Sequence, residues 1–267
     1  MLVRKHLVYS FIFFSIFTPS LFAQTLLDLK SESIQAQLKN LSKSKVKTIY
    51  DPAYKKAMLF WAYSCKDLLT LSPQMMLMKD EDSVILEASD GYKIPVNLGI
   101  LRHPQCYLAD SLADHSSMKE LSWKQFGHGK EASTPGPYYI IWQNGDIRKD
   151  KKPWPWALVA LRKEDIADDA LIRPKNPALN AGFKLFKDNC ISCHSINLVG
   201  GKVGFEMNIP KNITEYVSFE FFSSFALAPE SYRAESKMPA QKLSKGDLQA
   251  IWSYLQGKVQ EKIYKTK

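Results

Sequence analysis

The most constraining feature of this 267-residue sequence is one pentapeptide, Cys190-Ile191-Ser192-Cys193-His194. It reads C-x-x-C-H, the attachment signature of c-type haem. Two thiols three residues apart reach both vinyl groups of one porphyrin, and the imidazole that follows lies beneath the iron as proximal ligand. A bare C-x-x-C would also suit a redox dithiol or half of a zinc site. His194 favours haem, and no second ligand pair at zinc spacing follows it.

The first residues have the organisation of a secretory signal peptide. Arg4 and Lys5 precede an apolar run over residues 7–17, and Pro19 and Ala23 then supply a helix breaker and a small residue. This order predicts cleavage after Ala23 and a periplasmic mature protein, in a compartment where c-type haem is attached and disulfides persist. The alternative is an uncleaved anchor. No other apolar run approaches the roughly 20 residues that span a bilayer, so no span is expected in the mature protein.

The charge of the chain is basic and unevenly distributed. There are 36 Lys and Arg against 27 Asp and Glu, a formal net charge of +9, and 45% of the residues are hydrophobic, which excludes a disordered chain. From residue 170 onward, 14 basic residues stand against 8 acidic ones, a net charge of +6. Such a surface steers an acidic partner, or is simply a solvated lysine surface. No nucleic-acid partner is expected, because no basic run is interleaved with aromatic residues.

Two predicted helices frame the pentapeptide. Asn176-Pro177 opens the first, because Asn is a favoured N-cap and Pro a favoured first helical residue. Ser244 caps the second, with Asp247 as a weak capping-box partner. Apolar residues recur at helical spacing on Leu179, Gly182, Phe183 and Phe186, and again on Leu248, Ile251, Trp252 and Leu255. A glycine opposite aromatic residues lets two helices cross closely, so residues 176–258 are expected to enclose a haem. A further helix with phenylalanines for the pocket wall is expected over residues 214–228.

This part of the sequence resembles the class I cytochrome c family over about residues 178–256. The resemblance rests on residues 182–186 before the pentapeptide, residues 200–204 after it, Lys237-Met238-Pro239-Ala240, and residues 248–255. In that family a Met-Pro pair before the last helix supplies the sixth iron ligand. The resemblance therefore implies one covalent haem c, ligated by His194 and Met238.

Other sixth ligands stay open at this point. Met207 lies only 13 residues past His194, although the resemblance places it in the loop along the haem edge and methionines often fill cores. Without a methionine ligand the sixth position would be open. His103, His115 and His128 lie in the other domain, so each is expected to be an ordinary surface or hydrogen-bonded histidine.

The rest of the mature chain predicts a mixed, strand-rich domain over residues 24–162. Residues 24–50 are polar and helix-prone, and residues 51–72, opening with Asp51-Pro52, are expected to be helical. Short strands are predicted at residues 84–86, 93–96, 138–142 and 156–161, with turns at Asp90-Gly91 and Asn144-Gly145. Residues 163–175 are then the linker to an all-α cytochrome c domain at residues 176–267. The predicted fold class is α+β.

About residues 84–162 of this domain resemble the molybdopterin-binding domain of the sulfite oxidase family. The matching pieces are residues 88–92 with the strand that follows, residues 107–110, and residues 136–142 leading to Trp156. That family needs a cysteine that binds molybdenum ahead of these elements. Cys65 is the only candidate, and it lies very close to the start of the domain. The resemblance therefore implies a shortened relative that has lost molybdopterin and keeps a recognition or docking task.

Cys65 and Cys106 are the two remaining cysteines. In an oxidising compartment two leftover cysteines of one domain usually pair, which predicts a disulfide between them. Two buried free thiols, or Cys65 as a metal ligand, are the alternatives.

These features predict an exported electron carrier that moves single electrons between redox donor and acceptor proteins, such as a periplasmic dehydrogenase or a terminal oxidase. A thioether opposite the imidazole fills the coordination sphere and favours reduced iron, which suits electron transfer over substrate binding. No catalytic residue is assigned. Two alternatives stay open: a molybdenum-dependent oxidoreductase of sulfite dehydrogenase type with a fused cytochrome, and a haem enzyme or gas sensor with an open sixth position.

Overall fold

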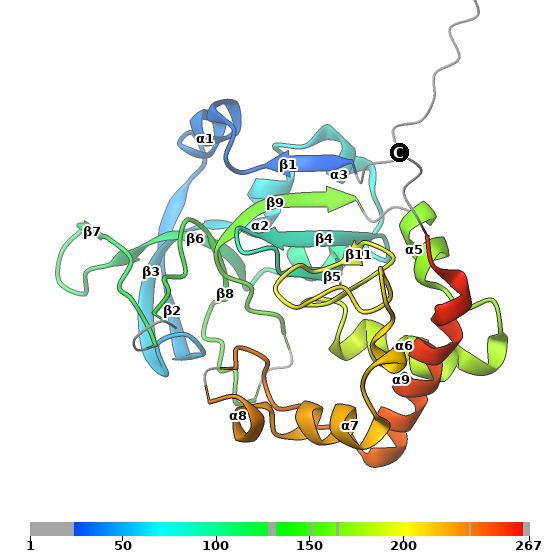
Figure 1. Cartoon of the computed structure of the whole chain (residues 1–267). Coiled ribbons are helices and arrows are strands. Elements are labelled where there is room, and N and C mark those ends of the chain that lie inside the picture. Colours follow the sequence, from blue (N-terminus) through cyan, green and yellow to red (C-terminus); the bar gives the residue numbers. More distant parts are fainter. Residues whose placement is uncertain (1–23, 128–131, 150–151, 164–165, 235, 264–267) are drawn as a thin grey trace, which may run out of the picture.

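The computed structural model describes residues 24–127, 132–149, 152–163, 166–234 and 236–263 (Figure 1). The predicted signal peptide, residues 1–23, lies outside the described residues, and so does His128. A strand-rich part comes first along the chain and a mainly helical part follows, in agreement with an α+β fold.

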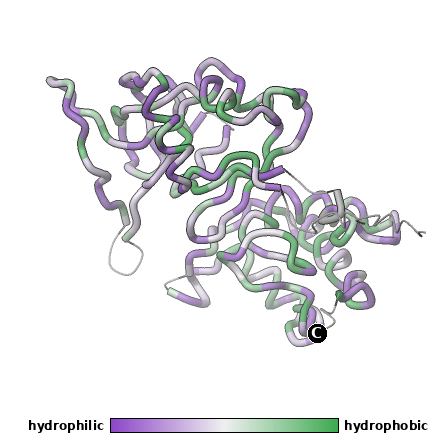
Figure 2. The backbone as a smooth tube through the Cα atoms, turned by 90° about the horizontal axis from the view of Figure 1, so that it is seen from above, coloured by the Kyte–Doolittle hydropathy of each residue, from purple (hydrophilic) through white to green (hydrophobic). Residues whose placement is uncertain are grey.

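The strand-rich part contains two antiparallel sheets. The first has the order β1-β9-β4-β5, from β1 (Thr25–Asp28), β9 (Leu158–Lys163), β4 (Ser83–Ala88) and β5 (Lys93–Asn97). The second runs β2 (Lys43–Asp51), β3 (Lys56–Ser64), β6 (Cys106–Ala113) and β7 (Glu120–Leu121), and β8 (Tyr139–Trp142) also pairs with β6. Both sheets contribute buried side chains to one core, to which β4 supplies Val84 and Leu86 and β3 supplies Phe60. Figure 2 shows several hydrophobic stretches running through the middle of the molecule.

The prediction of one helix over residues 51–72 is wrong for residues 56–64, which form strand β3. The Asp51 carboxylate accepts hydrogen bonds from the amides of Ala53 (2.9 Å) and Tyr54 (3.0 Å), and it therefore closes the β2–β3 turn rather than opening a helix. β3 pairs with β2 on one side and β6 on the other, and this long-range ladder outweighs local helix propensity. Only α2 (Cys65–Leu69) is helical in the second half of this range.

Residues 24–50 contain less helix than their composition suggests. α1 (Glu32–Leu38) is capped by Ser31, whose hydroxyl accepts the amide of Ile34, and it lies between strands β1 and β2. The remaining helices of this part are α3 (Pro73–Leu77) and α4 (Leu98–Leu101). The four strands predicted further along are confirmed as β4, β5, β8 and β9, within one or two residues of the expected ends.

The helical part is built on the crossing of α6 (Asn180–Asn189) and α9 (Lys245–Lys258). The predicted close approach is confirmed at Gly182, where an added Cβ would lie 2.0 Å from the Ala250 carbonyl oxygen. The ring of Tyr254 lies 5.5 Å from the rings of Phe183 and Phe186, so aromatic side chains fill the space beside the crossing. The capping box of Ser244 is also present in the structure.

The helix expected over residues 214–228 is interrupted. A 3₁₀ turn (Ile213–Glu215) comes first, and α7 (Phe219–Leu227) then starts after a new cap, the Ser218 hydroxyl, which accepts the amide of Phe221. The short helix α8 (Pro229–Tyr232) follows. Further 3₁₀ turns precede α6 (Pro177–Leu179) and follow α9 (Val259–Glu261). This part also contains a two-stranded ribbon of β10 (Ser195–Ile196) with β11 (Val199–Gly200).

The segment predicted as a linker contains helix α5 (Ile166–Ile172), which lies beside the end of α9 (Figure 1). Ile172 is buried in the core of the helical part, and its carbonyl accepts the Tyr254 hydroxyl at 2.7 Å. The ammonium of Lys258, only 1% exposed, donates to the carbonyl of Leu171 (3.0 Å) and to the carboxylate of Glu261 (2.6 Å). These contacts fix the end of α5 to the last long helix.

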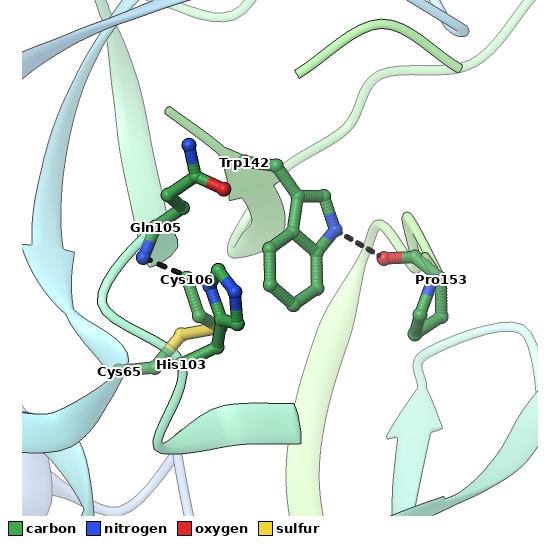
Figure 3. Close-up of a disulfide and its surroundings, with 6 residues drawn as sticks. All are labelled: Cys65, His103, Gln105, Cys106, Trp142 and Pro153. Atoms are coloured by element: carbon green, nitrogen blue, oxygen red, sulfur yellow. Dashed lines mark hydrogen bonds between the residues drawn. A yellow bond between two sulfur atoms is a disulfide. The ribbon is translucent and has the colours of Figure 1, made fainter. Parts of the chain in front are cut away.

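Cys65 and Cys106 form a disulfide in the structure, with Cα atoms 5.4 Å apart. Both cysteines are fully buried, and the bond ties the start of α2 to the start of β6. Figure 3 shows His103 and Trp142 beside it, with ring centroids 5.9 Å apart. His103 is hydrogen-bonded, because its Nδ1 accepts the amide of Gln105 at 3.2 Å.

Candidate functional site

The pentapeptide forms a tight turn at the C-terminal end of α6. The amide of Cys190 donates to the carbonyl of Phe186 (2.8 Å), and the amide of His194 donates to the carbonyl of Cys190 (2.9 Å). Phe186 is fully buried, and Cys190 packs against the same core. Helix α6 therefore anchors both cysteines and the histidine on one turn of chain, which we call the attachment turn (residues 190–194).

The imidazole of His194 is oriented by the backbone. Its Nδ1 lies 3.0 Å from the carbonyl oxygen of Phe205. Since a carbonyl only accepts, Nδ1 carries the proton and Nε2 keeps the lone pair that a metal would use. Burial lowers the pKa of His194, which favours the neutral ring that metal ligation requires. Metal-binding histidines are commonly held in this way by their second nitrogen.

Glycines let the following loop approach the attachment turn. A Cβ at Gly204 would lie 2.4 Å from Cε1 of His194, and a Cβ at Gly201 would lie 2.0 Å from the carbonyl oxygen of Ser192. Any side chain at either position would displace the turn. The glycines of residues 200–204, which carried part of the sequence resemblance, therefore have a steric role beside the histidine.

The two thiols of the attachment turn are not bonded to each other. Burial raises the pKa of both thiols, to about 12 for Cys190, and each sulfur lies in the field of a further negative group. A reactive redox dithiol needs a thiolate at neutral pH, and hence a lowered thiol pKa. A thioether is uncharged and suits such a buried position, so the surroundings favour haem attachment over a redox dithiol.

A buried polar network supports the loop after the attachment turn. The carboxylate of Glu206 accepts the amides of Asn197 (3.0 Å) and Asn208 (2.9 Å). The side chain of Asn208 donates to that of Asn197 (2.8 Å), and Asn212 donates to Asn208 (2.7 Å) and to the Leu255 carbonyl of α9 (2.9 Å). No sequence pattern predicted a role for Asn197, Glu206 or Asn208, and the density of asparagines in this segment was the signal available for finding them.

The two candidate methionines differ in their surroundings. Met207 is 5% exposed and packs in the core of the helical part, while its amide donates to the Ser195 carbonyl at 2.8 Å. Met238 is half-buried in the loop between α8 and α9, and its amide donates to the Ser236 hydroxyl at 3.3 Å. Met207 is therefore part of the packed core, and its side chain would have to move out of that core to bind iron.

Exposed apolar side chains gather in one stretch of the helical part. Among the described residues, seven of the eleven large hydrophobic side chains that are exposed lie between residues 198 and 232; they are Leu198, Val203, Phe205, Tyr216, Phe221, Leu227 and Tyr232. The ring of Phe205 lies 5.1 Å from that of His194. Phe221 and Tyr232 also contact each other, with ring centroids 5.4 Å apart. Exposed apolar side chains such as Phe205, which lies directly beside the imidazole, suit contact with a flat, largely apolar group such as haem.

The strand-rich part contains a cavity of about 680 Å³ that is separate from the attachment turn. Aromatic side chains of Tyr63, Trp123 and Tyr138 form part of its wall, together with the ion pair of Lys43 and Asp110 (2.8 Å). No cysteine lines this cavity. Cys65, the one candidate that the sequence offers for a molybdenum-binding cysteine, is bonded to Cys106 and therefore has no free thiolate.

Comparison with known proteins supports a cytochrome c domain at this site. The family described as Cytochrome c matches residues 179–258, which include the attachment turn and the whole of α9. A cytochrome c domain implies bound haem and electron transfer. No curated protein and no solved structure matches the chain. Within the described residues, no helix is both long and apolar enough to cross a membrane.

Proposed function

We propose that this chain is an exported c-type cytochrome, which carries one haem bound through thioethers of Cys190 and Cys193 and ligated by His194 and Met238. The haem supplies a one-electron couple. The chain's own residues position the imidazole, fill the coordination sphere and exclude water, so the protein passes single electrons between a donor and an acceptor.

The observation that carries this proposal is the orientation of His194. Its Nδ1 faces the Phe205 carbonyl, which leaves Nε2 as the ligating nitrogen one residue after the second cysteine. The uncovered apolar side chains of residues 198–232 add a surface on which a porphyrin would rest. The choice of Met238 as the sixth iron ligand is supported by the packing of the alternative, Met207, in the core.

The strand-rich part, residues 24–162, serves partner recognition in this proposal and holds no molybdopterin. The disulfide supports this assignment because it engages Cys65, the one cysteine in the expected direction. The net charge of +6 from residue 170 onward supports attraction of an acidic redox partner, with a rate that falls as salt rises. The signal-like residues 1–23 support export to the periplasm, where the donor and acceptor would be met.

Haem staining after denaturing electrophoresis tests the attachment. Thioether bonds survive denaturation, so the wild-type protein should keep its haem on the polypeptide, and the double variant Cys190→Ala/Cys193→Ala should lose it. Ser192→Ala, between the two cysteines, is the matched control and should keep the stain. Haem that acidic organic solvent extracts from the wild type would contradict the proposal.

Metal analysis of the same protein tests the absence of molybdopterin. Protein produced in a host that synthesises molybdopterin should contain one iron per chain and no molybdenum. Stoichiometric molybdenum would instead support the oxidoreductase alternative.

A further inference from the structure

The turn between β4 and β5 has a fixed shape of its own. Oδ1 of Asp90 accepts the amide of Tyr92 (2.9 Å), and the amide of Gly91 donates to the carbonyl of Ala88 (3.1 Å). Gly91 has a φ of +90°, which glycine adopts without steric penalty. We call residues 90–93 the hairpin turn.

Two backbone hydrogen bonds join the hairpin turn to the region of the attachment turn. The amide of Lys93 donates to the carbonyl of Ser192 (2.9 Å), and the amide of Lys202 donates to the carbonyl of Gly91 (2.9 Å). A Cβ at Gly91 would lie 2.9 Å from Cβ of Lys202, so the two segments are in direct contact. Ser192 lies between the two cysteines. The strand-rich part is therefore bonded to the attachment turn itself and not merely to a neighbouring surface.

The side chains of the hairpin turn lie beside the second cysteine. The hydroxyl of Tyr92 is hydrogen-bonded to the side chain of Ser192, and burial raises the pKa of Tyr92, with the nearby Cys193 adding to the effect. Asp90 is exposed, and it lies next to Gly91, whose carbonyl accepts the amide of Lys202. An aromatic ring from the other part of the chain thus contacts the residue before Cys193, and a carboxylate lies on the same turn.

We propose that the hairpin turn is a fixed cover over the Cys193 side of the haem, and that Tyr92 and Asp90 set its reduction potential from outside the cytochrome domain. This inference rests on the proposed function. An oxidised haem site carries one more positive charge than the reduced site, so water and negative charge stabilise the oxidised state. Tyr92 excludes water and raises the potential, whereas Asp90 lowers it. An electron-transfer partner must then approach the haem from another side.

Redox titration of the full-length, haem-loaded protein tests the cover through two variants with opposite expected signs. Tyr92→Ala admits water and should shift the potential downward. Asp90→Asn removes the negative charge but keeps an oxygen that accepts the Tyr92 amide, so the turn persists and the potential should shift upward. Glu81→Gln neutralises an exposed carboxyl at the opposite end of β4 and should leave the potential unchanged. A general loosening of the structure would lower the potential in both test variants.

Amide hydrogen exchange gives a second readout that does not depend on electron transfer. The amides of Lys93 and Lys202 should exchange slowly in the wild type, because both are engaged in the contact between the two parts. Potentials that match the wild type in both variants, or that fall in both, would overturn the cover, as would fast exchange of both amides. A wild-type protein without covalent haem would overturn the proposed function as well.

Discussion

His194 is held by the main chain of Phe205: the carbonyl oxygen lies 3.0 Å from Nδ1, and the phenyl ring meets the imidazole nearly edge-on. Because a backbone group makes the hydrogen bond, a substitution of the Phe205 side chain leaves the acceptor in place. A change that moves the backbone at residues 204–205 removes it. The orientation of the His194 imidazole therefore depends on the glycine next to Phe205.

Gly204→Val should disturb iron ligation without removing the haem from the chain. The new Cβ would lie 2.4 Å from the imidazole, so the ring has to move and lose its hydrogen bond. Loss of such a supporting contact typically weakens metal binding about 10–100-fold. Optical spectra together with the electrophoretic haem stain would detect altered ligation in a protein that still carries covalent haem.

Gly246→Ala is the control for this substitution, because the nearest atom to an added Cβ there is the Ser244 hydroxyl at 3.7 Å. Its spectrum should equal that of the wild type. A Gly204→Val spectrum that is also unchanged would show that the imidazole does not depend on this close approach.

The two methionines should separate into a ligand and a core residue. Met207→Ala removes a buried side chain and should cost about 2–5 kcal/mol of unfolding free energy while the methionine-to-iron charge-transfer band persists. Met238→Ala should abolish that band and let the reduced protein bind carbon monoxide. Denaturant unfolding and absorption spectroscopy of both variants measure this, and Met207→Leu is a volume-matched control. Loss of the band in the Met207 variant alone would show that Met207 is the ligand and Met238 is not.

The disulfide should contribute to the stability of the strand-rich part. Its two cysteines are separated by 41 residues, and closing a loop of that length restricts the unfolded chain by about 3–4 kcal/mol. Cys65→Ala/Cys106→Ala should therefore unfold at lower denaturant concentration with an unchanged haem spectrum. Thiol titration of the denatured, unreduced wild type should find no free thiol, and two reactive thiols would exclude both the bond and its effect.

Asp51 should make stability depend on pH with an unusual sign. Its carboxyl is buried, and burial raises its pKa above the ordinary 3.8, although the amides of Ala53 and Tyr54 and the hydroxyl of Tyr139 oppose this. The folded protein then keeps this proton to higher pH than the unfolded chain does, so the contribution of Asp51 to the unfolding free energy falls as pH rises through the window between those two pKa values.

Asp51→Asn keeps an oxygen for the two amides but has no proton to lose. The stability of this variant relative to the wild type should therefore increase as pH rises above 3.8, the ordinary pKa of the carboxyl, as measured by urea unfolding at each pH. Glu81→Gln, at an exposed carboxyl, is the control and should show a flat difference. A flat difference for Asp51→Asn would mean that the buried carboxyl ionises as it does in the unfolded chain.

Short-range sequence patterns predicted the structure correctly where the stabilising interactions are themselves short-range. The caps at Asn176 and Ser244 predicted the helical segments that contain α6 and α9, because a cap depends on residues within one or two turns. The range 51–72 failed for the opposite reason. Residues 56–64 gain their hydrogen bonds from β2 and β6, and β6 lies some 50 residues away along the chain, so local propensity had little weight.

The contact of the hairpin turn with the attachment turn was likewise beyond the reach of the sequence. Asp90-Gly91 announces a turn, and the structure has one there. No residue of this turn indicates a contact with Ser192, about 100 residues further along. That contact depends on how the strand-rich part and the helical part pack against each other.

The attachment of α5 to the helical part decides where the cytochrome could be cut out and grafted onto another protein. Ile172 fills part of its core, and the carbonyls of Leu171 and Ile172 receive Lys258 and Tyr254. A graft that began at residue 176 would leave a buried ammonium short of acceptors and a hole where Ile172 had been. A transplantable haem module from this chain should therefore begin ahead of α5, at about residue 164.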